Sequence, residues 1–301
     1  MNAFFDGFYP HAPVVHIPTF NVDDCEAEIF LAMAALGAQY RHEHRKGVWL
    51  FYAAKSILQE KAREKERKAI NENLFLRGGS PRELPYDELM REARCALYLI
   101  VFAMWQTEPE IVREAFNLQS FLATCVRESR LEENQESLQT NTRDWHGWVR
   151  QESYRRIKLF SFAFLNLLSI EFNLPPVLLS DEVHLRLPSA CIEWISPSAE
   201  RWAAIYNSGH QNQMFFQDAL SQLTKSSKES QLSGSQPVPS PLANYILLQA
   251  LIQRITLVHQ AFRSNGGEEH TLLNTQKEDI RYLHISSFHS LYFDGSLICA
   301  S

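Results

Sequence analysis

The sequence has little cysteine, glycine or proline, and these shortages exclude several classes of protein. Its five cysteines are Cys25, Cys95, Cys125, Cys191 and Cys299, and no two lie within the two to four residues that a zinc finger or zinc cluster requires. An odd number of widely spaced cysteines is typical of reduced thiols in the cytosol or nucleus. With 11 glycines and 13 prolines among 301 residues, the chain is not a low-complexity protein. We expect Cys95 and Cys125, which fall in helical patterns, to be small core residues.

Net positive charge is also lacking. The formal net charge is -6 and the isoelectric point is about 6.0. Domains that bind DNA or RNA along the phosphate backbone usually have an isoelectric point above about 9. We therefore expect no broad binding of nucleic acid by this chain.

Long apolar runs are absent as well. The N-terminal stretch Met1–Pro10 carries no basic segment, which argues against a secretory signal. The longest apolar runs, Cys95–Trp105 and Leu159–Ile170, are shorter than the roughly 20 residues that a membrane-spanning helix needs. We interpret both runs as buried core helices and predict no membrane span.

No catalytic or metal-binding motif occurs, since GxSxG, P-loop, GxGxxG and HExxH patterns are all missing. His11 and His16 lie in a segment broken by prolines, and His42 and His44 are two residues apart and cannot share a helix face. A metal site needs three or four converging ligands, so we expect surface or packed histidines. We assign no catalytic, cofactor-binding or metal-binding residue and predict that the chain is not an enzyme.

The acidic residues Asp23, Asp24 and Glu28 could suggest a helical enzyme that holds magnesium against a diphosphate. Such an enzyme needs a second acidic set on a facing helix, and the sequence shows none. Both aspartates stand just before a predicted helix. We therefore expect one of them to cap that helix.

Apolar residues recur at helical spacing through most of the chain, and no convincing pair of strands is present. The helices predicted in this way span residues 26–40, 46–69, 86–105, 108–130, 144–172, 198–206, 211–224 and 242–263. Asp23 or Asp24 and Thr107 are the expected caps of the first and fourth helices. The pattern predicts an all-α, multi-helix single domain with proline-rich connectors.

The segments between the helices are predicted from their prolines, glycines and polar residues. Pro10, Pro13 and Pro18 favour an extended segment over residues 4–20 that docks on the core. Loops are expected at 71–85 and 132–142, an extended stretch up to Pro188, and an irregular stretch at 189–197. The linker at about 225–241 is rich in serine and expected to be flexible.

The helix predicted at 144–172 contains two contrasting halves. Apolar side chains surround its second half (Phe160, Phe162, Phe164, Leu165 and Leu168), which indicates a buried helix. Its first half carries Glu152, Arg155 and Arg156, whose spacing suits ion pairs within the helix worth about 0.2–0.5 kcal/mol each. The alternative is a contact that pins this helix to a neighbouring segment.

Residues 59–68 of the second predicted helix are almost all charged, with mixed signs. A solvated helix end is one interpretation, and a nuclear-localisation or nucleic-acid patch is the other. The interleaved glutamates favour the solvated end.

Several segments resemble the fungal-specific transcription factor domain. Phe5, Tyr9-Pro10, Pro13 and His16–Phe20 are similar to its opening pattern F-x-x-F-H-P-x-x-P-x-x-H-x-P-T-F, and Leu31–Tyr40 resembles its L-A-M-A-A-I-G-A-x-Y helix. Leu50–Ala54 is similar to its second helix.

Further similarities follow in the same order. The pattern W-x(3)-E-S-x-R-R and a later P-P pair are matched by Trp148, Glu152-Ser153, Arg155-Arg156 and Pro175-Pro176. The next matches are Leu185, Leu187-Pro188, Trp194 and Trp202, followed by Asn244–Ile255. The branch that carries a two-Cys two-His zinc finger fits best. The resemblance covers roughly residues 4–263.

The resemblance implies a nuclear, all-helical domain that regulates RNA polymerase II transcription, in many members for metabolic or secondary-metabolite genes. Its expected partners are proteins of the transcription machinery or a small effector, with a dimer as one arrangement, and no membrane. Members carry an upstream zinc-bearing DNA-binding module, and zinc would be a cofactor only with that module. DNA contact is therefore expected to be indirect.

On the same comparison, residues 1–263 are expected to form the regulatory domain, and residues 264–301 a divergent, poorly ordered tail. The chain looks like a core domain cut at both ends. Two other functions remain open: a helical metabolic enzyme with an unrecognised site, and an inactive regulator fragment.

Overall fold

The computed structural model of the protein describes residues 1–75, 86–133, 144–207, 213–224 and 239–264. Every regular element in these residues is helical, so the predicted all-α class is confirmed. The only strand-like features there are two isolated bridges, one between Glu132 and His184 and one between Arg186 and Phe215. The predicted tail at 264–301 and most of the predicted linker lie outside the described residues.

The described residues fall into two compact units. The first unit contains Met1–Tyr9 and Asn21–Arg130, and the second contains Pro10–Phe20 and the chain from Leu131 onward. The units are therefore interleaved along the sequence, because a short early segment belongs to the later unit.

The first unit consists of a short π-helix and four α-helices. These are η1 (Phe4–Phe8), α1 (Ala27–Tyr40), α2 (His44–Phe75), α3 (Tyr86–Met104) and α4 (Pro109–Glu128). The second half of α3 is apolar on all sides, and all of its residues from Cys95 to Ala103 are buried. A helix of this kind must be surrounded by others, and α3 packs against α1, α2 and α4. Cys95 and Cys125 are buried, as predicted.

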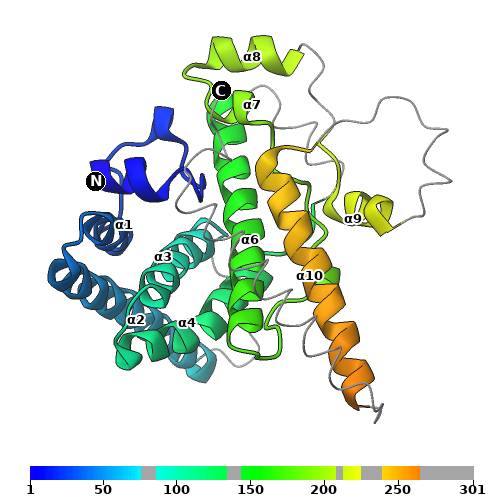
Figure 1. Ribbon diagram of the computed structural model, residues 1–301. Coiled ribbons are helices and arrows are strands. Elements are labelled where there is room, and N and C mark those ends of the chain that lie inside the picture. The colour runs from blue at the N-terminus through cyan, green and yellow to red at the C-terminus, as the bar shows by residue number, and fades with distance from the viewer. Residues whose placement is uncertain (76–85, 134–143, 208–212, 225–238, 265–301) are drawn as a thin grey trace, which may run out of the picture. The chain divides into compact units, whose positions relative to one another are not determined.

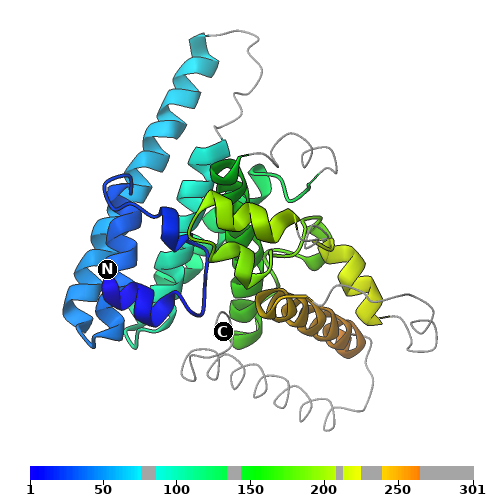
Figure 2. The same cartoon turned by 90° about the horizontal axis from the view of Figure 1, so that it is seen from above.

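The α2 helix is longer than predicted, and in Figure 2 its cyan half extends past α1. Lysines in this helix pair with acids of neighbouring helices: Lys61 Nζ lies 2.5 Å from Glu28 Oε1, and Lys65 Nζ lies 2.8 Å from Glu88 Oε1. Lys65 also contacts Glu92. The charged stretch of α2 thus contacts neighbouring helices through these two lysines, both of which are paired with acids.

The η1 helix corrects the prediction of an extended segment over residues 4–20. Its Phe4 and Phe8 rings lie 5.5 Å and 5.8 Å from the Tyr98 ring, and both phenylalanines are buried. The prolines that forbid a helix begin only at Pro10, so a helical turn before them is allowed. Gly37 permits the close approach, because a Cβ there would lie 3.2 Å from the Phe4 backbone nitrogen.

The predicted caps of α1 and α4 are wrong. Glu26 and Glu108 occupy the N-cap positions, and neither makes a side-chain capping bond. Asp24 instead accepts a hydrogen bond from Asn21 Nδ2 at 2.9 Å, within the preceding turn. Short polar side chains often form such local bonds. Here the Asp24 carboxylate bonds to Asn21 and does not cap α1.

The second unit is organised around the long helix α6 (Trp145–Glu171), drawn in green in Figure 1. Asp144 caps α6 by accepting hydrogen bonds from the His146 and Gly147 backbone N–H groups, both at 3.1 Å. The chain is buried continuously from Glu152 to Ser169, so the predicted core segment is confirmed. The remaining elements are η2 (Ile17–Thr19), η3 (Ser180–Glu182), α7 (Cys191–Trp194), α8 (Ala199–Asn207), α9 (Phe216–Thr224) and α10 (Pro241–Ser264).

One detail of the second unit differs from the predictions. A short helix, α7, stands within the stretch 189–197 that was expected to be irregular. On the last helix, apolar residues at helical spacing lie on both faces: Leu247 is buried, but Leu248, Ile255 and Val258 are exposed. In this unit α10 packs against α6, α9 and η3 through its opposite face.

By length and composition alone, Pro241–Gln260 in α10 could cross a membrane, which the lengths of the uninterrupted apolar runs do not indicate. Of this window, 44% is buried inside the protein.

Candidate functional site

The most unusual polar feature of the second unit is a cluster of three charged side chains inside α6. Glu152, Arg155 and Arg156 occupy positions i, i+3 and i+4, and their relative exposures are 0%, 7% and 1%. Charged side chains are rarely buried to this degree unless they are paired. We call these three residues and their hydrogen-bond partners the α6 network.

The Glu152 carboxylate accepts hydrogen bonds at both oxygens. Oε1 accepts from Arg156 Nε and from the Ser189 backbone N–H, each at 2.8 Å. Oε2 accepts from Arg155 Nη1 and from Gln213 Nε2, the latter at 3.3 Å. Burial by itself would raise the pKa of Glu152, but Arg155 and Arg156 outweigh it and hold the pKa below its usual value.

Arg156 joins α6 to two distant segments of the chain. Its Nη1 donates to the Pro13 carbonyl at 3.2 Å, and its Nη2 donates to the Ser189 carbonyl at 3.1 Å. The guanidinium also lies over the Trp194 ring, 4.2 Å from its centre. A planar group with five donors suits this task, because it can stack and bond in several directions at once.

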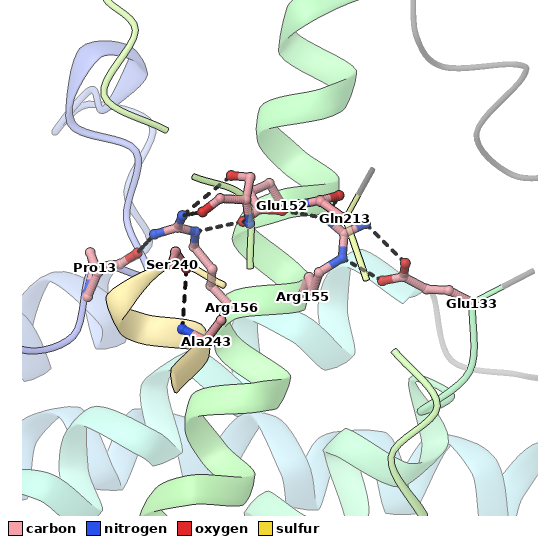
Figure 3. Close-up of polar contacts among 9 residues, drawn as sticks. Pro13, Glu133, Glu152, Arg155, Arg156, Gln213, Ser240 and Ala243 are labelled. Atoms are coloured by element: carbon pink, nitrogen blue, oxygen red, sulfur yellow. Dashed lines mark hydrogen bonds and ion pairs between the residues drawn. The ribbon is translucent and has the colours of Figure 1, made fainter. Parts of the chain in front are cut away.

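Arg155 extends the network on the other side of α6, as Figure 3 shows. It pairs with Glu133 through two bonds, Nε to Oε1 at 2.8 Å and Nη2 to Oε2 at 3.1 Å. Paired hydrogen bonds of this kind fix geometry as well as charge. The α6 network therefore ties together five parts of the second unit: Pro13, Glu133, α6, Ser189 and Gln213.

The segment held by Arg156 is further fixed by His16, a buried residue of the opening motif. His16 Nδ1 lies 2.9 Å from Thr19 Oγ1, and its ring lies 5.0 Å from the Trp194 ring and 5.7 Å from the Trp145 ring. Burial, with Arg156 nearby, lowers the pKa of His16 to about 4, so the ring is neutral near pH 7. His16 is thus a packed histidine, as the sequence predicted.

The structure corrects the prediction that Glu152 forms only weak ion pairs within its own helix. Both arginines do pair with Glu152 within the helix, but the pairs are buried and extend to distant segments. The structure therefore bears out both the ion pairs within the helix and the alternative, a contact that pins the helix to other segments. Sequence reasoning did not find Pro13, Ser189 or Glu133 as partners.

The α6 network has the properties of a structural contact that holds segments of the second unit together. Every Glu152 oxygen is already bonded to cations or N–H groups, which leaves little capacity to accept a proton as a general base. Ser189 bonds Glu152 through its backbone N–H, and its hydroxyl accepts from Arg156 Nη2 at 3.4 Å. Within the described ranges, no three histidine, cysteine or acidic side chains are grouped so that they could hold a metal ion.

Glu193 in α7 is a second buried acid near the network, and sequence reasoning missed it. Its exposure is 3%, and Oε1 has no hydrogen-bond partner among the described residues. Burial and the nearby Glu152 charge raise the pKa of Glu193 to about 7, against the opposing effect of Arg156 and the Ala190 backbone. The folded protein therefore binds a proton at Glu193 near neutral pH.

Replacing Glu193 by glutamine is expected to stabilise the protein in a pH-dependent way. The pKa of Glu193 rises from 4.5 to about 7 on folding, so its favourable contribution is complete below pH 4.5 and is lost as the pH rises through 7. Urea unfolding at several pH values should show little difference between Glu193→Gln and wild type at pH 5, and a gain of about 2 kcal/mol for the variant at pH 8.

The matched control for this change is Glu200→Gln, at an exposed glutamate of α8. Its unfolding free energy should follow that of the wild type at every pH. A gain for Glu193→Gln that is equally large at pH 5 and pH 8 would contradict the assignment.

Comparison with known proteins gives two matches. The family described as "Fungal specific transcription factor domain" matches residues 1–286. The zinc finger protein zas1 of Schizosaccharomyces pombe is 24% identical over 216 residues, which cover 68% of this chain and 22% of that protein. The chain thus spans only a minor part of this curated relative. No solved structure matches significantly.

Proposed function

Since this chain belongs to the fungal-specific transcription factor domain family, we propose that it regulates RNA polymerase II transcription in the nucleus. It acts through contacts with proteins of the transcription machinery or with a small effector. The observation that supports this proposal is the family match over residues 1–286, which contains all of the α6 network. The all-helical architecture agrees with it.

The genes controlled are proposed to be metabolic or secondary-metabolite genes, as in many members of the family. The relative zas1 is a zinc finger protein, which agrees with the zinc-finger-associated branch. By analogy, a zinc-bearing module outside this chain would supply the contact with DNA, and zinc would be its cofactor.

Weak binding of DNA by this chain follows from its charge. The formal net charge is -6, and several cations of the first unit are already paired. Besides Lys61 and Lys65, Lys55 Nζ lies 2.6 Å from Glu114 Oε1. Sequence-independent binding to DNA depends on free lysines and arginines that neutralise phosphates, so the expected affinity is low.

The experiment is a tethering assay in yeast. The whole chain is fused to a heterologous DNA-binding module, and a reporter gene carries the site of that module. Transcription of this reporter is expected to change several-fold relative to the module alone, while a reporter without the site is unaffected. The unfused chain should bind varied DNA duplexes weakly and without sequence preference at ~150 mM salt.

Two results would contradict the proposal. A fusion that reaches the nucleus and leaves the reporter unchanged would argue for an inactive fragment. Selective, nanomolar binding of one duplex by the unfused chain would show that the chain itself contacts DNA.

A further inference from the structure

Arg186 is a buried arginine of the second unit that the α6 network does not use. Its exposure is 5%, and its Nε has no hydrogen-bond partner among the described residues. The guanidinium lies over the Phe215 ring, 5.0 Å from its centre. Arginine is rarely buried to this degree unless it is paired, so a partner for this cation is to be expected.

The backbone around Arg186 is held on both sides. The His184 N–H donates to the Leu131 carbonyl at 2.8 Å, and the Leu187 N–H donates to the Met214 carbonyl at 2.8 Å. Arg186 itself forms an isolated bridge with Phe215. A backbone fixed in this way keeps the guanidinium in place, so the buried charge is a lasting property of the fold.

The acid that attracts Arg186 is Glu133, and this acid is already bonded to another arginine. Both Glu133 oxygens accept from Arg155, Oε1 at 2.8 Å and Oε2 at 3.1 Å (Figure 3). Burial lowers the pKa of Arg186; the attraction of Glu133 opposes this shift, and the repulsion of Arg155 adds to it. One carboxylate is thus shared between two buried guanidinium groups.

Lys158 brings further positive charge to the same region. It follows Arg155 by three positions on α6, so the two share a helix face, and it is 3% exposed. Burial lowers the pKa of Lys158 to about 8, opposed by Glu133 and reinforced by Arg155. Lys158 is therefore mostly charged at pH 7, and Glu133 attracts three cations.

The side chains beside Arg186 leave room for a small partner only at the surface. Tyr206, Gln213 and Phe215 are half-buried, whereas the guanidinium lies beneath them. Arg186 opposes the rise in the pKa of Tyr206 that burial and Glu193 cause, so the phenol is within electrostatic reach of the guanidinium. A phenol can donate a hydrogen bond to an anion.

We propose that Arg186 binds the carboxylate or phosphate group of a small molecule. A guanidinium presents a planar set of donors that matches both groups with paired, charge-assisted hydrogen bonds. The anion would supply the charge that Glu133 cannot give to Arg155 and Arg186 together. An acidic side chain of a protein partner is favoured less, because a large surface cannot easily reach a guanidinium buried to this degree.

An anion bound here would be the small effector of the proposed function, so this inference rests on that function for its role and names the chemical class of the effector. The binding itself is measured on the purified chain. A tethered chain that leaves the reporter unchanged would contradict the regulatory role and not the site. Absence of anion binding would contradict the site and leave regulation through protein contacts.

Thermal melts and titration calorimetry of the whole chain at pH 7 test the site. Malonate and inorganic phosphate are the probes, and sodium chloride at equal ionic strength is the reference. Malonate, phosphate or both should raise the melting temperature by a few degrees, with saturation, because a ligand that binds only the folded state stabilises it. The probe that acts identifies the group as carboxylate or phosphate.

Two variants locate the binding. Arg186→Gln removes the cation and should abolish the response to both probes. Arg186→Lys keeps the charge but loses the paired donors, so it should bind malonate or phosphate several-fold more weakly than wild type. The matched control is Arg201→Gln, at an exposed arginine of α8, which should respond like wild type.

Three results would overturn the proposal. The first is a wild type that responds to malonate and phosphate no more than to chloride. The second is an Arg186 variant that binds the probe as tightly as wild type; if Arg186→Gln does not fold, Arg186→Lys decides this. The third is a response of the wild type to a tetraglutamate peptide but to neither small anion, which would assign Arg186 to an acidic protein partner.

Discussion

Replacing Glu152 by glutamine is expected to lower the free energy of unfolding by about 3–5 kcal/mol, the cost of breaking a buried ion pair. Arg155 and Arg156 would remain buried while losing the carboxylate that both of them contact. The glutamine amide would also present N–H donors to guanidinium groups that can only donate. Urea unfolding monitored by circular dichroism measures the change.

The matched control is again Glu200→Gln, the same chemical change at an exposed glutamate. Its effect should stay within about 0.5 kcal/mol. Similar midpoints for Glu152→Gln and Glu200→Gln would mean that the α6 network contributes little to stability. Loss of soluble protein for Glu152→Gln alone would agree with the prediction, because many domains are stable by only about 5–15 kcal/mol.

Truncating Phe164 to alanine is expected to cost about 3–5 kcal/mol, the range for a buried phenylalanine. Phe164 is 2% exposed and its ring stacks with that of Phe160 at 6.3 Å. The loss combines the transfer of the ring into water with the cavity that remains. A thermal melt should therefore show a much lower midpoint than wild type.

Glu66→Ala, at an exposed position of α2, is the control for this truncation. It should change stability by less than about 0.5 kcal/mol. If Phe164→Ala and Glu66→Ala melt at the same temperature, Phe164 is not part of a rigid core.

Helices could be predicted from this sequence because their apolar periodicity is strong. The stretch from Phe160 to Leu168 is apolar on all sides of the helix. A helix of this kind is stable only when it is buried away from water. The outward stripe of α10 could not be predicted in the same way. Both of its faces are apolar, and the choice between them depends on the bonds of Gln249 and Gln253 to partners more than 70 residues away.

The candidate site was only partly visible in the sequence. The spacing of Glu152, Arg155 and Arg156 indicates pairing within a helix. Their other key partners are the backbone carbonyls of Pro13 and Ser189. Every residue has such a carbonyl, so no residue type marks it in advance. Likewise, the burial of Glu193 arises from the fold around α7 and leaves no local pattern.

The interleaving of the two units affects how deletion series of this protein should be interpreted. The chain passes from the first unit to the second after Tyr9, returns at Asn21, and leaves again after Arg130. A fragment that starts at Leu131 would lack the Pro13 carbonyl, an acceptor of the buried Arg156. Loss of activity on N-terminal truncation could thus report damage to the distant helix α6, and would not by itself map a binding region to the deleted residues.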